Sequence, residues 1–371
     1  MTTGLVWHET YMWHDPGNFA GLFRPVGFVQ PGEHVEHAES KRRLKNLLDA
    51  TGFIDHLEMI RPRPATEQEL LRFHVPDYLE RVETLSRANG GDAGKNAWFS
   101  AHGAGIAKLS AGGVIEAVEA VLRGRVTNAY ALVRPPGHHA EPTFGRGFCI
   151  YGNAGIAAMH AFAEHRLDRI AFIDWDVHHG NGQQAGFWED PRALTISIHQ
   201  DGVAPPDSGR ITEIGEGRGK GYNINIPLPP GCGAAAYTRL FETIVLPALY
   251  DFRPDLIIVP CGFDAGIHDP LGRMVLLPSA FGKMTAMVMQ AARDLCGGRL
   301  VMCHEGGYST STVPFLALPV FEQLTGRSAG FENPVEAFLQ AIPGQELQAH
   351  EEAAIDRARE AAAGHAWRRK S

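Results

Sequence analysis

Two kinds of apolar pattern alternate along the chain. Short runs rich in β-branched residues, which are typical of buried strands, lie at residues 128–133, 169–173, 193–198, 255–259 and 299–302. Longer segments with apolar residues every three to four positions predict helices at residues 40–50, 102–122, 152–164, 234–250 and 279–295. Because strands that alternate with helices form parallel sheets, the sequence predicts an α/β fold with a mostly parallel central sheet flanked by helices.

The rest of the chain favours a single domain over residues 1–371, without an internal repeat or a dividing linker. Stretches rich in Gly and Pro lie at residues 11–37, 88–96, 200–221 and 262–277. They are too long for plain connectors, so we expect them to shape a site. The C-terminal region, 344–371, is expected to hold a polar helix at 345–363 and a tail. This helix either packs its Leu and Ile residues on the body or binds a partner.

Polar motifs directly follow the predicted strands. They read Arg134-Pro135-Pro136-Gly137-His138-His139, Asp174-Trp175-Asp176-Val177-His178-His179-Gly180-Asn181-Gly182, His199-Gln200, Cys261-Gly262-Phe263-Asp264 and His304-Glu305-Gly306-Gly307-Tyr308. The carboxyl ends of parallel strands meet at one edge of the sheet, and open α/β sheets bind their ligands there. We therefore expect these distant motifs to converge on one site.

The second and fourth motifs contain a candidate metal site. Asp176 and His178 stand at i and i+2, so a strand end would point both side chains to the same side. Asp264 can supply a third ligand from another strand end. One imidazole and two carboxylates leave an open position on a Zn²⁺ ion, as a catalytic site requires. An isolated Asp-x-His more often forms only a hydrogen bond, but the dense polar run after an apolar strand favours the metal site.

The adjacent imidazoles of His138 and His139 follow a Pro-Pro-Gly turn that fixes the backbone. Adjacent histidines are more often surface residues, but these two follow a strand beside the predicted metal site. Asp174 and Asn181 are available to orient them. A carboxylate raises the basicity of its imidazole more than an amide does, so we expect the pair to divide into an acid and a base, with His139 as the base.

An aromatic pair completes the candidate site. The phenol of Tyr308 follows a Gly-Gly turn and can donate a hydrogen bond to a developing oxyanion. Phe148, next to Gly147, is a candidate apolar wall for the substrate, with core packing as the alternative.

Composition narrows the classes of function. Apolar residues make up 44% of the 371 residues, and the net charge of −8 argues against a nucleic-acid binder. No apolar run approaches the ~18 residues that a membrane span needs. The five cysteines include no C-x-x-C pair, which disfavours a disulfide framework and a cysteine-built zinc site. We therefore expect a cytoplasmic protein.

The motifs, in this order and spacing, resemble those of the histone deacetylase family of zinc amidohydrolases. The resemblance extends over residues 5–330. Asn181, Leu271 and the segment 222–229 resemble class II members, and bacterial histone deacetylase-like amidohydrolases in particular. This resemblance implies an arginase/deacetylase-like fold and the hydrolysis of N-acyl amides, with acyl-lysine as the main substrate class.

The resemblance also implies roles for individual positions. One Zn²⁺ is expected on Asp176, His178 and Asp264. The implied catalytic residues are His138, His139, Tyr308, Asp174 and Asn181, and the implied substrate-binding residues are Gly147, Phe148 and Leu271. Structural K⁺ is implied at two sites, formed by Asp174, Asp176, His178, Ser197 and Ile198, and by Phe187, Asp190, Ala193 and Tyr222. The implied partners are an acylated lysine peptide or small acyl amide, and further copies of the chain in a dimer or tetramer.

Two places depart from the family pattern. Close relatives have a tunnel-wall Phe before Pro-Pro-Asp-Ser-Gly, whereas this chain has Ala204, so we expect a wider tunnel. The rim loop usually reads His-Pro-Glu-x-Pro, but residues 37–41 read His-Ala-Glu-Ser-Lys, so a different rim geometry is expected.

Three other functions are weighed against this interpretation. An arginase-type ureohydrolase uses two Mn²⁺ ions, but Gly266 stands where its second carboxylate should be. An acetylpolyamine amidohydrolase of class II type carries a Glu gatekeeper in Asp-Pro-Glu-Gly, where this chain has Leu271. A zinc-dependent acyl-lysine reader without catalysis would lack one of the catalytic groups, and all of them are present.

Overall fold

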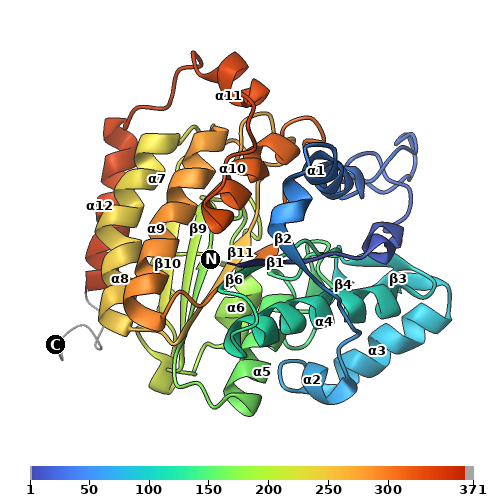
Figure 1. Cartoon of the computed structure of the whole chain (residues 1–371). Helices are drawn as coiled ribbons and strands as arrows, with labels where there is room; N and C mark the ends of the chain where they lie inside the picture. Colours follow the sequence, from blue (N-terminus) through green and yellow to red (C-terminus); the bar gives the residue numbers. More distant parts are fainter. Residues whose placement is uncertain (1, 364–371) are drawn as a thin grey trace.

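An eight-stranded parallel sheet forms the centre of the computed structural model, which describes residues 2–363 (Figure 1). In order across the sheet, its strands are β10 (Asn223–Leu228), β9 (Ala193–Gln200), β8 (Ile170–Asp174), β11 (Leu256–Cys261), β12 (Leu300–His304), β6 (Asn128–Ala131), β1 (Thr3–Val6) and β2 (Leu57–Ile60). All five predicted strands are present, with ends shifted by one or two residues. The α/β fold with a parallel sheet is therefore confirmed.

Three strands of this sheet were missed by the sequence prediction. β1 and β2 are only four residues long, so their apolar pattern is too brief to distinguish from other apolar runs. β10 contains Pro227, which argues against an interior strand. The structure places β10 at the edge of the sheet, where a proline is tolerated.

Helices cover both faces of the sheet (Figure 1). They are α1 (Glu39–Ala50), α2 (Glu67–Leu71), α3 (Pro76–Arg87), α4 (Gly103–Leu122), α5 (Asn153–Glu164), α6 (Asn181–Gly186), α7 (Ala234–Leu240), α8 (Leu246–Phe252), α9 (Pro278–Cys296), α10 (Val313–Thr325), α11 (Pro334–Leu339) and α12 (Ala349–Ala363). The helix predicted at 234–250 is divided into α7 and α8 by a π-helical turn, Phe241–Val245. α2, α3, α6, α10 and α11 were not predicted.

Two apolar cores lie on the two faces, because successive side chains of a strand point in opposite directions. In β8, Ala171 and Ile173 pack into the core beneath α1, α7 to α10 and α12. Ile170 and Phe172 pack into the opposite core, beneath α4 and α5. Both faces of the central strands are therefore buried, which leaves the strand ends as the place where polar groups can gather.

The C-terminal helix α12 packs on the body, as one of the two interpretations predicted. It lies against β10 and α7, and its Ile355 and Ala358 are buried in the first core. The predicted tail extends into residues 364–371, which lie outside the described part of the chain.

The Gly- and Pro-rich stretches contain little regular structure. The short 3-10 helices Glu9–Trp13 and Gly217–Gly219 overlap these stretches, and a third, Phe53–His56, lies outside them. The stretch 88–96 differs from the prediction, because it contains β3 (Gly90–Asp92) and β4 (Gly94–Lys95), which pair with β5 (Trp98–Ser100) and β7 (Gly145–Arg146). Among residues 2–363, no helix combines the length and the apolarity needed to cross a membrane.

Candidate active site

Four neighbouring strands deliver the predicted side chains to one edge of the sheet. The strands β8, β11, β12 and β6 are adjacent in the sheet. Asp176 and His178 follow the end of β8, and Asp264 follows β11. His138 and Tyr308 follow β6 and β12 in the same way. The expected convergence at the carboxyl ends of the strands is present in the structure.

Asp176, His178 and Asp264 form a compact cluster of metal-ligand type. One ligand atom from each of the three lies within 4.8 Å of the others, and all three residues are buried. The Nδ1 atom of His178 lies 3.0 Å from Oδ1 of Asp176 and 3.1 Å from Oδ2 of Asp264. The residues that the sequence singled out as zinc ligands are therefore brought together.

Backbone amide groups hold the two carboxylates of this cluster. Gly306 N–H donates to Oδ2 of Asp176 (2.8 Å), and Val177 N–H donates to Oδ1 of Asp264 (2.8 Å). A Cβ atom on Gly306 would lie 2.1 Å from Oδ2 of Asp264, so only glycine allows this approach. The Gly-Gly sequence before the tyrosine thus shapes the cluster as well as the turn.

The electrostatics of this cluster favour a bound cation. Burial opposes the charged form of His178, but its hydrogen bonds to Asp176 and Asp264 raise its pKa to about 10. Two buried carboxylates thus attract positive charge to their centre. One imidazole nitrogen and two carboxylate oxygens suit Zn²⁺, so the residues present fit that ion.

The paired histidines stack beside this cluster with different partners. Their ring centroids are 3.9 Å apart. Nδ1 of His138 lies 3.0 Å from Oδ2 of Asp174, and Nδ1 of His139 lies 2.7 Å from Oδ1 of Asn181. The carboxylate and the amide expected to orient the two rings are thus each in contact with one of them.

The two imidazoles have pKa values shifted in opposite directions. Burial alone would lower the pKa of His138, but the charges of Asp176 and Asp174 outweigh burial and raise this pKa well above its usual range. Burial and the positive charges of His138 and His178 lower the pKa of His139 well below its usual range. The charged form is therefore favoured on His138 and the neutral form on His139.

The aromatic pair lies next to the histidines. The Phe148 and Tyr308 rings meet edge to face with centroids 5.9 Å apart. Burial raises the pKa of Tyr308 well above its usual range, so the phenol remains a hydrogen-bond donor. Gly147 has φ +48°, and a Cβ atom there would lie 2.5 Å from Cδ2 of His139. Glycine is thus required where the backbone before Phe148 approaches the ring of His139.

Asp269 is a positioning residue that sequence reasoning missed. Its Oδ2 accepts a hydrogen bond from Tyr308 N–H (2.7 Å), and its Oδ1 accepts one from Leu271 N–H (2.8 Å). This buried carboxylate therefore links the loop of half-buried Leu271 to the backbone of Tyr308. The motif Asp-Pro-Leu-Gly, residues 269–272, could have indicated a role for Asp269, but the sequence analysis assigned a role only to its Leu.

Glu305 is a second residue whose role was missed. It is fully buried between His304 and Gly306, and its Oε2 accepts hydrogen bonds from Gly137 N–H (2.6 Å) and His138 N–H (3.1 Å). Burial raises the pKa of this carboxyl to about 7. Glu305 thus joins the loop after β12 to the backbone of the histidine pair.

The segment 37–41, for which a different rim geometry was expected, leads into a helix. Residues 39–41 lie in the first turn of α1, and Lys41 is buried, with Nζ 3.5 Å from Oε1 of Glu36. Nε of Arg134 binds the same oxygen at 2.8 Å. This buried ion cluster anchors the stretch 11–37 to the Arg-Pro-Pro-Gly turn.

The positions implied as potassium ligands lie on β8 and β9, in the segment between these strands and, for Tyr222, directly before β10. Asp174 is in register with Ser197, whose Oγ accepts a hydrogen bond from Gly180 N–H. The carbonyls of Phe187 and Asp190 accept backbone hydrogen bonds within one turn, and Ala193 donates to Asp190. The carbonyl of Tyr222 accepts one from Thr195 N–H. Ile198 pairs with β10 and its side chain lies in the core.

The position of the expected tunnel phenylalanine is occupied by a half-buried Ala204. Its carbonyl accepts a hydrogen bond from His179 N–H at 3.1 Å. The methyl side chain is much smaller than the phenylalanine ring that the family pattern predicts at this position.

Comparison with known proteins places these features in a family. A model of the histone deacetylase domain matches residues 34–324. A histone deacetylase-like amidohydrolase of Pseudomonas aeruginosa is 47% identical over 341 residues, covering 91% of this chain and 90% of that protein. Histone deacetylase clr3 of Schizosaccharomyces pombe is 35% identical over 331 residues, covering 83% of this chain and 48% of that protein. The crystal structure of an HDA15 HD domain superposes with a TM-score of 0.84 and 31% identity, covering 97% of this chain and 94% of that one.

Proposed function

The chain belongs to the histone deacetylase family of amide hydrolases, and from this premise we propose that it removes acyl groups from acyl-lysine side chains with one Zn²⁺ ion. Asp176, His178 and Asp264 would hold the ion. The observation that carries the proposal is the buried cluster of these three ligands beside two stacked imidazoles, one held by a carboxylate and one by an amide. No packing requirement explains so many buried charges at one strand edge.

The two imidazoles divide the proton transfers. When bound, Zn²⁺ supplies a Lewis acid that polarises the acyl carbonyl and makes water more acidic. His139, whose Nδ1 faces the oxygen of Asn181, presents a neutral Nε2 that takes the proton of the attacking water. His138, whose charged form is favoured by Asp176 and by its contact with Asp174, stabilises the negative charge that develops nearby. A protonated imidazole then delivers a proton to the leaving amine, which completes the hydrolysis.

Tyr308 binds the acyl oxygen, and Phe148 contacts the lysine side chain that carries the acyl group. The phenol of Tyr308 donates a hydrogen bond to the oxyanion, in the orientation set by Asp269. Phe148 provides an apolar wall beside it, and Leu271 provides an apolar contact at the loop of Asp269. Ala204 leaves room on the other side, which supports tolerance of acyl groups bulkier than acetyl.

An acetylpolyamine amidohydrolase is the alternative function. A polyamine chain is cationic and would need a carboxylate near the mouth of the site, whereas the half-buried Leu271 is apolar. This residue favours the lysine side chain over the polyamine.

The proposal also includes bound K⁺, the cellular compartment and the oligomeric state. We place K⁺ ions at the two sites named above, because carbonyl and carboxylate oxygens are the ligands they contain. The five cysteines are all free and buried, which supports a reducing, cytoplasmic compartment. We also infer that copies of the chain assemble into a dimer or tetramer.

A substrate panel tests this function. Purified protein is offered peptides with acetyl-, trifluoroacetyl- and longer acyl-lysine, and acetylspermidine, each with and without a chelator. We expect chelator-sensitive hydrolysis of the lysine amides, with acetylspermidine cleaved at least tenfold more slowly. Faster cleavage of acetylspermidine would select the alternative function, and absence of all amide hydrolysis would overturn both.

A further inference from the structure

A second cluster of metal-ligand type lies between the ends of two helices. Glu119 belongs to the last turn of α4, His160 to α5, and His165 follows the end of α5. Oε1 of Glu119 lies 2.7 Å from Nε2 of His160 and 2.6 Å from Nε2 of His165. One ligand atom from each residue lies within 4.8 Å of the others. The cluster thus offers two imidazole nitrogens and a carboxylate oxygen.

This cluster is separate from the candidate active site. Both α4 and α5 end shortly before a strand begins, at Asn128 in β6 and Ile170 in β8. The ends of these helices therefore lie at the amino edge of the parallel sheet. The active-site motifs lie beyond the carboxyl ends of the same strands.

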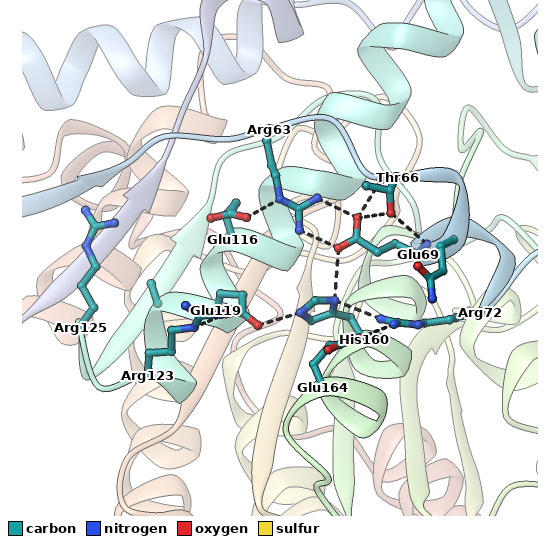
Figure 2. Close-up of a pocket in the computed structure, with 12 residues that line it drawn as sticks. Arg63, Thr66, Glu69, Arg72, Glu116, Glu119, Arg123, Arg125, His160 and Glu164 are labelled. Atoms are coloured by element: carbon teal, nitrogen blue, oxygen red, sulfur yellow. Dashed lines mark hydrogen bonds and ion pairs between the residues drawn. The ribbon is translucent and has the colours of Figure 1, made fainter.

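A supporting carboxylate faces the other nitrogen of His160. Nδ1 of His160 lies 3.3 Å from Oε1 of Glu69, and Figure 2 shows the ring between Glu69 on one side and Glu119 on the other. Glu69 is fixed by Arg63 (2.6 Å) and by Thr66 N–H (2.8 Å). A fixed carboxylate on the distal ring nitrogen is the usual way in which a metal-binding histidine is oriented. One terminal nitrogen of the Arg72 guanidinium also lies 3.3 Å from Nδ1 of His160, and the other terminal nitrogen pairs with Glu164.

The side chains that line the adjacent cavity carry an uncompensated negative charge, which favours a bound cation. This cavity has a volume of about 520 Å³. Its carboxylates are Glu69, Glu116, Glu119 and Glu164, and its arginines are Arg63, Arg72, Arg123 and Arg125. Arg63 pairs with both Glu69 and Glu116, Arg72 pairs with Glu164, and Arg125 pairs with Glu58 outside the cavity. Glu119 pairs with Arg123, whose side chain is 74% exposed. Three paired arginines therefore serve four carboxylates, which leaves one negative charge in the cavity uncompensated.

We propose that Glu119, His160 and His165 bind a divalent transition-metal ion, with Zn²⁺ as the ion that best suits two imidazoles and a carboxylate. The cavity leaves space for water to complete the coordination. The three groups contact one another as Asp176, His178 and Asp264 do at the predicted catalytic site, where an imidazole nitrogen also lies within 3.1 Å of carboxylate oxygens. The ion would join the ends of α4 and α5 and stabilise the fold.

Counting zinc in matched variants tests this site. Wild-type protein, equilibrated with Zn²⁺ and desalted, should contain two zinc ions per chain by elemental analysis. His165→Gln should contain one and keep its deacetylase activity within about twofold, because His165 is remote from the active-site motifs. His56→Gln, which changes an exposed histidine, should retain two ions. One ion in the wild type, or two in His165→Gln, would overturn the proposal.

Two further measurements test the site even if His165→Gln does not fold, or if it loses zinc from the catalytic site instead. Added Zn²⁺ should raise the melting temperature of the wild type, with its active site already loaded, and should not raise that of His165→Gln. In wild-type crystals, anomalous scattering at the zinc edge should give a peak between Glu119, His160 and His165. Zinc-soaked crystals without this peak would overturn the proposal whatever the variant does, and a zinc loss that abolishes activity would point to the catalytic ion instead.

Discussion

Asp174 and Asn181 are similar in size, contact neighbouring imidazoles at 3.0 and 2.7 Å, and differ in charge. This one difference helps to separate the pKa values of His138 and His139, because a carboxylate stabilises an imidazolium and an amide oxygen does so less. The charged form is thereby favoured on one ring and the neutral form on the other.

Replacing Asn181 with Asp should move the pH profile of the enzyme. A carboxylate beside His139 would raise the pKa of this imidazole, which lies well below its usual range in the wild type. The base would then become protonated at higher pH, so the acid limb of kcat/KM should shift upward by at least about half a unit, which is ~3-fold lower activity at any pH on that limb. A pH–rate profile checks this, and an unchanged acid limb would rule out His139 as the base.

Replacing Tyr308 with Phe removes the phenol and keeps the ring. The loss of one hydrogen-bond donor to an oxyanion typically lowers kcat by about 10²–10³. We expect that loss without a change in zinc content or melting temperature, because Asp269 binds the backbone of residue 308 and not the phenol. Steady-state kinetics decide the matter, and near-normal turnover would exclude the phenol from catalysis.

At the scale of elements, the site depends on loops that are held by buried carboxylates. Glu305 after β12 accepts hydrogen bonds from the backbone of the His138 loop after β6. Asp269 does the same for the Tyr308 loop. Neighbouring strands place these loops side by side, and the carboxylates then fix their conformation.

Glu305→Ala should destabilise the protein and reduce its activity. Two buried amide groups would lose their acceptor, at a cost of about 1–3 kcal/mol each in the free energy of unfolding. Glu305→Gln retains an acceptor oxygen and should recover most of this stability. Chemical denaturation of the two variants tests the argument, which fails if Ala and Gln unfold at the same denaturant concentration as the wild type.

The helix α12 should contribute to stability through its buried face. Ile355 is fully buried in the core that also contains β10, so Ile355→Ala should lower the free energy of unfolding by about 2–5 kcal/mol. Arg357→Ala on the exposed face is the matched control, with an expected change within about 0.5 kcal/mol. Equal effects of the two substitutions in urea denaturation would mean that α12 is not docked as described.

At the scale of the whole molecule, the sequence predicted what depends on local pattern and strand-end motifs. The five central strands, and the meeting of Asp176, His178 and Asp264, follow from apolar runs that end in polar motifs. Edge strands such as β10 could not be predicted, because a proline in an edge strand looks like a strand breaker. The role of Glu305 depends on a partner 168 residues away, which no local pattern reveals.

The second cluster shows the same limit. Glu119 and His160 lie on regular helices 41 residues apart, and their spacing carries no motif. Their contact arises only because α4 and α5 pack side by side on one face of the sheet (Figure 1).

Return of zinc to metal-depleted enzyme tests the central claim most directly. Protein treated with a chelator and desalted is assayed for acetate release from an acetyl-lysine peptide while Zn²⁺ is added stepwise. We expect activity to be lost with the metal and restored by Zn²⁺ in the wild type, and not restored in Asp264→Asn. Full activity of the metal-depleted protein, or full restoration in Asp264→Asn, would contradict a catalytic zinc at Asp176, His178 and Asp264.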